Sequence, residues 1–129
     1  MEILFVVGRV LFGGYFVLMG INHFKNTAGL TAYATSKKLP APKESVYLSG
    51  LMLLLGGLGV ITGAFYAIAL WLLVIFLVAS AFTMHAYWKA GNPEEAKADK
   101  ASFQRNLAFA GAGLMLVTID AVWRYSLMF

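Results

Sequence analysis

Cysteine is absent from the 129 residues, and charged side chains are scarce at 12% of the chain. The missing thiols exclude thiol–disulfide chemistry, iron–sulfur clusters and thiolate metal sites. Soluble domains carry about 25% charged residues, whereas this chain is 60% hydrophobic with a mean hydropathy of +0.76. We therefore expect an integral membrane protein whose main partner is the lipid bilayer. Nucleic acid is not an expected partner, and no metal site can be read from the two histidines.

Apolar runs predict four membrane-spanning helices, at about 3–24, 46–64, 67–88 and 104–128. About 20 apolar residues cross the hydrocarbon core as a helix. The apolar stretch 46–88 is about twice that length, so it must fold back at Gly63 as a helical hairpin. The fold expected is all-α: residues 1–129 form one domain, an integral membrane four-helix bundle with a short interfacial helix between helices one and two. A plain polar loop is the alternative to that interfacial helix.

Lysine and arginine are distributed unequally between the two ends of the expected bundle. The end with both polar connections holds eight of them, and the other end holds two, Arg9 and Arg124. Loops rich in Lys and Arg remain in the cytoplasm. The sequence therefore predicts a multi-pass protein with both termini outside.

One stripe of the first helix carries Arg9, Gly13, Phe16, Gly20 and His23. A stripe with ionisable groups and glycines is not expected to face lipid, so we expect it to face the other helices. A Gly-x-x-x-Gly spacing at residues 59–63 also indicates close helix packing. That spacing fits either a contact within the chain or a homodimer seam.

A group of charged residues is expected near the outer end, namely Arg9, Asp120 and Arg124. Arg9 and Asp120 fall at about the same depth on the first and last helices, where an unpaired charge is costly. The first interpretation is a structural ion pair that joins the two helices. The alternatives are an anchor for a substrate anion, a proton path, or an arginine that extends to the outer surface.

A second polar group is expected at the cytoplasmic rim and consists of Asn22, His23, His85, Trp88, Arg105 and Asn106. One interpretation is a ligand site in which His and Asn donate to the carbonyl oxygens of a quinone while Trp88 stacks on its ring. A second is bis-histidine haem ligation, although two rim histidines fit it poorly. The third is a set of interfacial residues that cap helices and bind water.

Four motifs in order resemble those of the DoxX family of small membrane proteins. They are G-R-V-L-F-G-G-Y-F-V-L-M-G-I-N-H-F in the first helix, L-P-A-P followed by L-L-G-G, M-H-A-Y-W, and F-Q-R-N-L-A-F-A-G. The family pattern falls on Arg9, Gly20, His23, His85, Trp88, Arg105 and Asn106. One departure is Leu53, which stands about where many relatives carry a glutamate.

The resemblance implies a bacterial inner-membrane subunit associated with redox chemistry, since the family is named after subunits of a thiosulfate:quinone oxidoreductase. The first functional hypothesis is a redox-associated subunit that binds a quinone and exchanges electrons with a soluble redox partner. If it is an enzyme at all, it is a quinone-linked oxidoreductase subunit with no redox centre of its own, and no cofactor is certain. The alternatives are a non-catalytic membrane scaffold or anchoring protein, or a small-solute or lipid-binding transporter-like protein.

Overall fold

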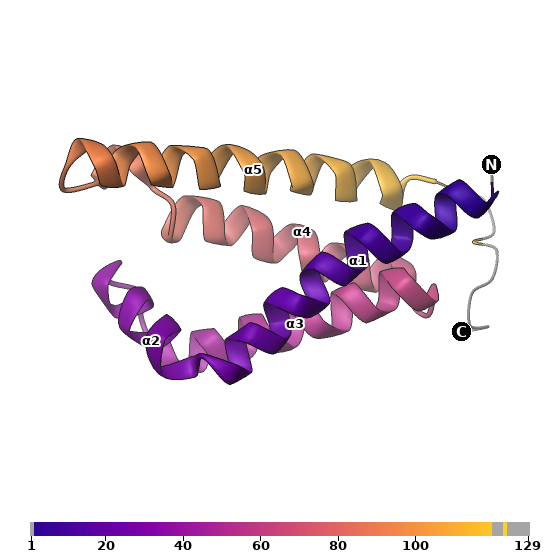
Figure 1. Cartoon of the computed structure of the whole chain (residues 1–129), viewed down its shortest axis with the longest axis horizontal. Coiled ribbons are helices and arrows are strands. Elements are labelled where there is room, and N and C mark those ends of the chain that lie inside the picture. The colour runs from indigo at the N-terminus through magenta and orange to yellow at the C-terminus, as the bar shows by residue number, and fades with distance from the viewer. Residues whose placement is uncertain (1, 120–122, 124–129) are drawn as a thin grey trace.

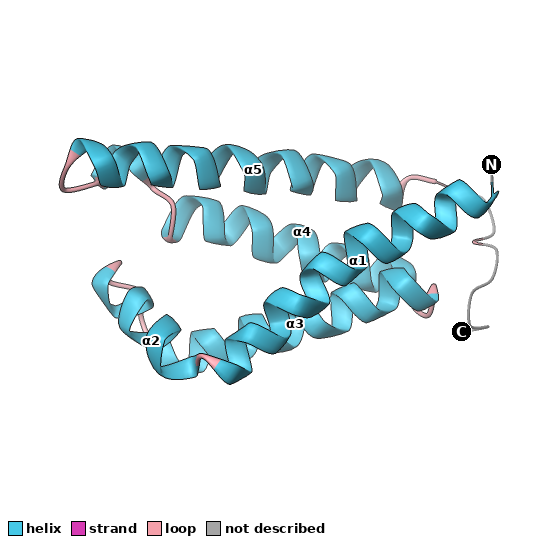
Figure 2. Cartoon of the chain, in the orientation of Figure 1, coloured by secondary structure: helices cyan, strands magenta, loops and turns pink. Residues whose placement is uncertain are grey.

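The computed structural model describes residues 2–119 and 123, and every regular element in that part of the chain is helical, as predicted. The elements, drawn in Figures 1 and 2, are α1 (Glu2–Lys25), α2 (Thr27–Ser36), α3 (Pro42–Thr62), α4 (Tyr66–Thr83), the 3₁₀ turn η1 (Tyr87–Lys89) and α5 (Pro93–Val117). Among the described residues, three segments are long and apolar enough to cross a membrane: α1, α3 and Tyr66–Lys89, which contains α4. The last expected span, 104–128, begins within α5 and runs beyond the described residues.

The turn between α3 and α4 lies where the long apolar stretch was expected to fold back. Gly63 follows α3 with φ of 79°, and its N–H donates to the carbonyl of Gly59 over 2.8 Å. Glycine adopts this left-handed conformation without the steric penalty of a Cβ, so it ends helices well. Phe65 is also left-handed, with φ of 49°, and α4 begins at the next residue.

Helix α5 begins eleven residues before the expected span, at Pro93 rather than at residue 104. Asn92 caps it, since its side-chain oxygen accepts from the backbone N–H of Glu95 over 2.8 Å. Proline is well suited to the first position of a helix, and acidic residues are favoured in the first turn. The first ten residues of α5 are therefore a polar helix and not a loop.

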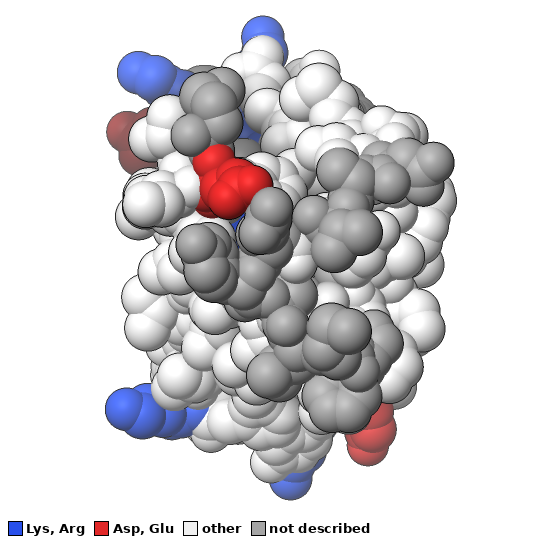
Figure 3. All heavy atoms as spheres, turned by 90° about the vertical axis from the view of Figure 1, so that its right-hand side faces the viewer, with Lys and Arg blue, Asp and Glu red and all other residues white. Residues whose placement is uncertain are grey.

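The long helices run alternately up and down the long axis of the molecule (Figure 1). Helix α1 packs on α3, α3 packs on α4, and α4 packs on α5, while α2 packs mainly on α3. One end of the molecule therefore holds α2, η1, the end of α4 and the start of α5; we call it the basic end. The Lys and Arg residues at this end lie in the connections, in η1 and in the adjoining parts of α1, α3 and α5: Lys25, Lys37, Lys38, Lys43, Lys89, Lys97, Lys100 and Arg105. Figure 3 looks onto the opposite end, where most of the surface in view that is not grey is uncharged.

Glycines bring α1 and α3 into close backbone contact. A methyl group on Gly13 would lie 2.6 Å from the carbonyl oxygen of Gly57, and one on Gly20 would lie 3.0 Å from that of Gly50. The buried residues of α1 are Arg9, Gly13, Phe16 and Gly20, which confirms the predicted inward stripe. In the Gly-x-x-x-Gly motif, Gly59 packs against Ala69 of α4, so this motif makes a contact within the chain.

The core is aliphatic and lies between α3 and α4, with Phe16 entering from α1. Its fully buried side chains are Phe16, Leu53, Val60, Leu70, Leu73 and Leu77. Many large apolar residues point outward instead, such as Leu11 and Leu18, at 70% and 69% exposed. Soluble monomers rarely expose apolar surface on this scale, so the outward faces of these helices fit a lipid environment.

Candidate functional site

A cavity of about 480 Å³ lies at the basic end between α1, α2, α3 and α4. Most of its wall is apolar and includes Met19, Leu30, Met52 and Phe76. The polar side chains that line it are Tyr33, Ser45, Ser49, Ser80, Thr83 and the two histidines, His23 and His85. The only histidines of the sequence, which are 62 positions apart, therefore line one cavity.

His23 is held against α3 through its Nδ1 nitrogen. That nitrogen lies 3.2 Å from the carbonyl oxygen of Val46 and 3.0 Å from the hydroxyl oxygen of Ser49. The close approach of the two helices allows these contacts, because Gly50 faces the Cβ atom of His23. A larger residue at position 50 would displace the imidazole from this wall.

His85 lies just beyond the end of α4, where the chain leaves the helix. The helix ends at Thr83, and the N–H of His85 donates to the carbonyl of Ser80 over 3.2 Å. Its Nδ1 lies 3.6 Å from a carboxylate oxygen of Asp99 on α5. This distance is too long for a good hydrogen bond, but the carboxylate is close enough to favour an N–H group at Nδ1 over a lone pair.

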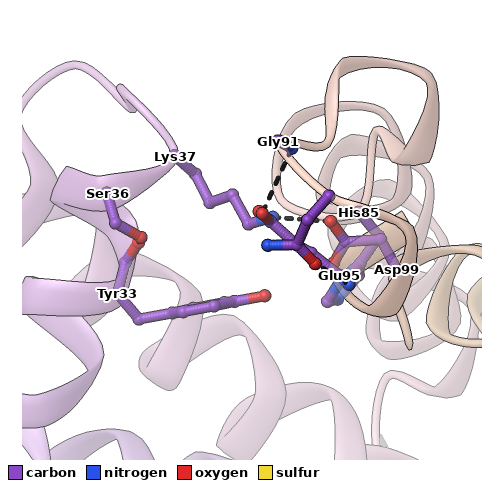
Figure 4. A network of polar contacts seen from close by, with 8 residues as sticks. Tyr33, Ser36, Lys37, His85, Gly91, Glu95 and Asp99 are labelled. Carbon is purple, nitrogen blue, oxygen red and sulfur yellow. Dashed lines mark hydrogen bonds and ion pairs between the residues drawn. The ribbon is translucent and has the colours of Figure 1, made fainter. Parts of the chain in front are cut away.

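An ion-pair network joins α2 to α5 beside the cavity (Figure 4). The ammonium group of Lys37 lies 2.6 Å from Asp99 and 2.9 Å from Glu95, which are one turn apart on α5. Asp99 is buried at 4% exposed, and its carboxylate lies between Lys37 and His85. Glu95 also accepts from the backbone N–H of Gly91 over 3.2 Å. The network therefore ties α2 across to α5 and places a carboxylate behind one wall of the cavity.

The pKa values in this network follow from its contacts. Burial lowers the pKa of Lys37, but the hydrogen bonds to Asp99 and Glu95 outweigh it and raise the pKa to about 12. The hydrogen bond from Lys37 is the main reason that the pKa of Glu95 lies below its ordinary value, with the bond from Gly91 adding to it. Lys37 and Glu95 are thus both charged at neutral pH.

The other residues of the expected rim site lie outside the cavity. Asn22 and Arg105 are exposed, and Trp88 is 52% exposed with its ring against Phe82 and Phe103. Asn106 is buried but is not part of the cavity wall. Of the predicted rim set, the structure brings His23 and His85 together and leaves the remaining members elsewhere at the same end.

Arg9 is buried at 3% exposed and binds the end of α3. Its guanidinium donates to the carbonyls of Val60 and Ile61 over 3.1 and 2.8 Å, and it lies 5.3 Å from the ring centre of Trp123. Carbonyls in the last turn of a helix lack partners within it and carry partial negative charge. Asp120 and Arg124, the expected partners in an ion pair, lie outside the described residues.

Sequence reasoning missed the contribution of Lys37, Glu95 and Asp99. Their contacts join residues 58 and 62 positions apart, so no local pattern announces them. One signal was present: Glu95 and Asp99 are four residues apart after a helix cap, which places both carboxylates on one face. The sequence does not show, however, that Lys37 from a distant segment lies opposite that face.

Comparison with known proteins adds one match. The model of the DoxX family matches residues 4–86, which extend from α1 through α4 to the cavity residue His85. No curated protein and no solved structure matches the chain.

Proposed function

The chain belongs to the DoxX family, and we propose that it is a redox-associated membrane subunit that binds a quinone or a similar small ligand at the basic end. The observation that carries this proposal is that His23 and His85 line the same apolar cavity. The motifs that contain these histidines are also among those that carry the resemblance to the family.

The cavity suits a ligand with an apolar body and a polar head. Sites for small ligands have volumes of about 300–1,000 Å³ and mostly apolar walls with a few polar groups. The cavity volume of about 480 Å³ falls in that range. Met52 and Phe76 would contact a flat ring or a chain, while the imidazoles would bind oxygen atoms of the head.

The proposed subunit would depend on a partner for electrons. It has no cysteine, and the part of the chain that is described contains no group of three or more His, Asp or Glu residues placed to hold a metal. Electrons would have to enter or leave through a soluble redox protein or a second bound substrate. The protein's own contribution would be to bind the ligand and to orient its head.

We also propose the finer membrane arrangement that the sequence predicts. The apolar part of α5 with the residues after it would form the fourth span of a four-helix bundle in the bacterial inner membrane, both termini outside. Helix α2 would lie in the headgroup region, where its attachment to α5 through Lys37 holds it over the cavity. The concentration of Lys and Arg at the basic end supports a cytoplasmic position for that end.

A non-catalytic scaffold is the second candidate function. The observation that favours it is that Asn22, Trp88 and Arg105 lie exposed at the basic end, outside the cavity. Exposed Trp and Arg side chains are frequent anchors in protein interfaces. In this case the exposed rim would bind a partner protein, and the cavity would hold only lipid.

The test is to measure binding of decylubiquinone and of its reduced form, decylubiquinol, to the purified protein in lipid nanodiscs. We expect His23→Ala and His85→Ala to weaken binding of whichever form binds more tightly about tenfold or more, since a tenfold change corresponds to about 1.4 kcal/mol. Asn22→Ala is the matched control, because Asn22 adjoins His23 but is not part of the cavity wall. Unchanged binding in a double histidine variant would contradict the site. An absorption spectrum is taken on the same sample, and a haem Soret band would favour bis-histidine ligation instead.

A further inference from the structure

We propose that the cavity selects the reduced form of its ligand, a quinol, over the oxidised quinone. This inference rests on the proposed function and adds the oxidation state of the ligand to it. Its basis is the hydrogen-bonding state of the two imidazoles, which the surrounding groups determine. A quinol presents two hydroxyl groups that can donate hydrogen bonds, whereas the quinone presents two carbonyl oxygens that can only accept them.

The contacts of His23 assign the proton of the neutral imidazole to Nδ1. One neighbour of Nδ1 is the carbonyl oxygen of Val46, which can only accept. The other is the hydroxyl of Ser49, whose single proton can go to a backbone carbonyl, at 2.7 Å from that of Ser45 or 3.1 Å from that of Val46. Its oxygen can then accept from Nδ1 at 3.0 Å. Because the carbonyl of Val46 can only accept, Nδ1 must be the donor in that contact. Nε2 of His23 is left with a lone pair and acts as an acceptor.

The same assignment follows for His85 from Asp99. Nδ1 of His85 lies 3.6 Å from one carboxylate oxygen of Asp99, and the other oxygen of this carboxylate forms an ion pair with Lys37 at 2.6 Å. A lone pair on Nδ1 would face a negative charge, whereas an N–H group is attracted to it. The proton of neutral His85 therefore lies on Nδ1, and its Nε2 is also an acceptor.

The two acceptor nitrogens are available to a ligand. Neither Nε2 atom has a hydrogen-bond partner in the described part of the chain, and neither is a buried atom. Both histidines line the cavity. The hydroxyl of a quinol would donate to such a nitrogen, whereas a carbonyl oxygen of the quinone would meet a second lone pair and form no bond.

Other groups of the cavity wall reinforce this preference. The hydroxyl of Ser45 donates to the carbonyl of Pro40, and that of Thr83 donates to the carbonyl of Ala79 over 2.7 Å. These oxygens, like that of Ser49, can therefore only accept from a ligand. Tyr33 and Ser80 retain hydroxyl protons without a partner among the described residues, and they would serve either form of the ligand.

The experiment compares decylubiquinol with decylubiquinone, which share one tail, in nanodiscs under argon by isothermal titration calorimetry. Empty nanodiscs serve as the control for partition into lipid. We expect the quinol to bind roughly tenfold or more tightly than the quinone, the fold-change that corresponds to about 1.4 kcal/mol. Equal affinities or tighter quinone binding would overturn the inference and leave the proposed function intact. Binding of neither form would overturn both.

A second comparison assigns the preference to the imidazoles. An amide can both accept and donate, so the double variant His23→Gln with His85→Gln should bind quinone and quinol within about threefold of each other, a difference of less than 1 kcal/mol. Asn22→Gln is the control and should retain the full preference, since Asn22 is outside the cavity wall. A preference that persists in the double variant would show that the imidazoles do not determine it.

Discussion

Lys37, which directly follows α2, and Asp99 of α5 form an ion pair of 2.6 Å between segments that are far apart in the sequence. Their side chains are 13% and 5% exposed, so the pair is largely removed from water. A buried carboxylate that loses its cation costs about 3–5 kcal/mol. The pair therefore adds a strong contact with α5 to the packing of α2 on α3.

Replacing Lys37 with methionine is expected to lower the free energy of unfolding by about 3 kcal/mol, because Asp99 would remain buried without its ammonium partner. Thermal or denaturant unfolding in detergent measures the change. Lys38→Met is the matched control, since Lys38 is exposed and should change stability by less than about 0.5 kcal/mol. Equal losses in the two variants would show that the ion pair does not stabilise the fold. The double variant Lys37→Met with Asp99→Leu should be less damaging than Lys37→Met alone.

The raised pKa of Lys37 predicts that the protein becomes less stable at alkaline pH. This pKa is about 12 in the folded chain against an ordinary value of 10.5. Because the folded-state pKa is the higher one, the contribution of Lys37 is complete below pH 10.5 and is lost as the pH rises through about 12. The difference in melting temperature between the native chain and Lys37→Met should therefore shrink over this range. Lys37→Arg should keep its stability there, because a guanidinium stays protonated at a higher pH than an ammonium group does; a difference that stays constant with pH would contradict the prediction.

Gly13→Ala is expected to destabilise the protein by about 1–3 kcal/mol through overpacking. The added methyl group would lie 2.6 Å from the backbone oxygen of Gly57 and 2.8 Å from Ile61, so α1 and α3 would have to separate. Gly14→Ala is the control, because nothing lies within 4 Å of a Cβ at that neighbouring position. It should be neutral or slightly stabilising, since alanine favours a helix more than glycine does. The two variants are compared by thermal unfolding in the same detergent.

Arg9→Leu is expected to destabilise the protein by about 3 kcal/mol, because hydrogen bonds from a charged donor contribute about 1.5–3 kcal/mol each. The variant would leave the carbonyls of Val60 and Ile61 without this donor. Arg105→Leu removes an exposed arginine and should have little effect on unfolding. A small loss in Arg9→Leu would mean that water or another residue replaces the guanidinium at the end of α3.

The expected ion pair between Arg9 and Asp120 is tested by a double-mutant cycle. If the two residues interact, Arg9→Leu with Asp120→Leu should be milder than the sum of the single changes. Additive losses would show that they do not interact, and Arg124 would become the expected partner of Asp120, one helical turn away in the sequence. Unfolding of the three variants in detergent gives the answer.

The membrane orientation is tested with single cysteines, which the sequence otherwise lacks. Lys97→Cys at the basic end should react with an impermeant maleimide only when the cytoplasmic side is open, and Glu2→Cys should react from outside. Both positions are exposed in the structure. Reaction of position 2 from the cytoplasm alone would reverse the proposed topology.

The inward face of α1 was predictable from the sequence, whereas the boundaries of α5 were not. Arg9, Gly13, Phe16 and Gly20 recur at helical spacing, and this periodicity alone indicates the buried stripe. Helix α5 begins in a polar segment where hydropathy gives no signal, and its start is indicated only by Asn92 as the helix cap and Pro93 in the first turn. The third expected span, 67–88, agrees with the apolar segment Tyr66–Lys89, although α4 ends at Thr83 within it and η1 follows after a short break.

The two histidines of the site were predictable, but their surroundings were not. Both were expected at the same end because each falls near the end of an apolar run. The cavity also depends on α2, which is placed by Lys37, Glu95 and Asp99 through contacts between distant parts of the chain. The position of a residue along a helix predicts its depth in the bundle but not whether its side chain points into the cavity. For this reason the prediction also included residues at the depth of the histidines that lie outside the cavity: Asn22, Trp88 and Arg105.

The attachment of Arg9 to the end of α3 has a consequence for how the chain is made. Val60 is 51 positions later than Arg9, so the carbonyl that binds the guanidinium is synthesised well after α1. At roughly 5–20 residues per second, this delay is about 3–10 seconds. During that interval the guanidinium of Arg9 on the newly synthesised α1 must stay near water or lipid phosphate. It can reach its final depth only when α3 is present to bind it. Helix α1 should therefore complete its insertion as a pair with α3 and not alone.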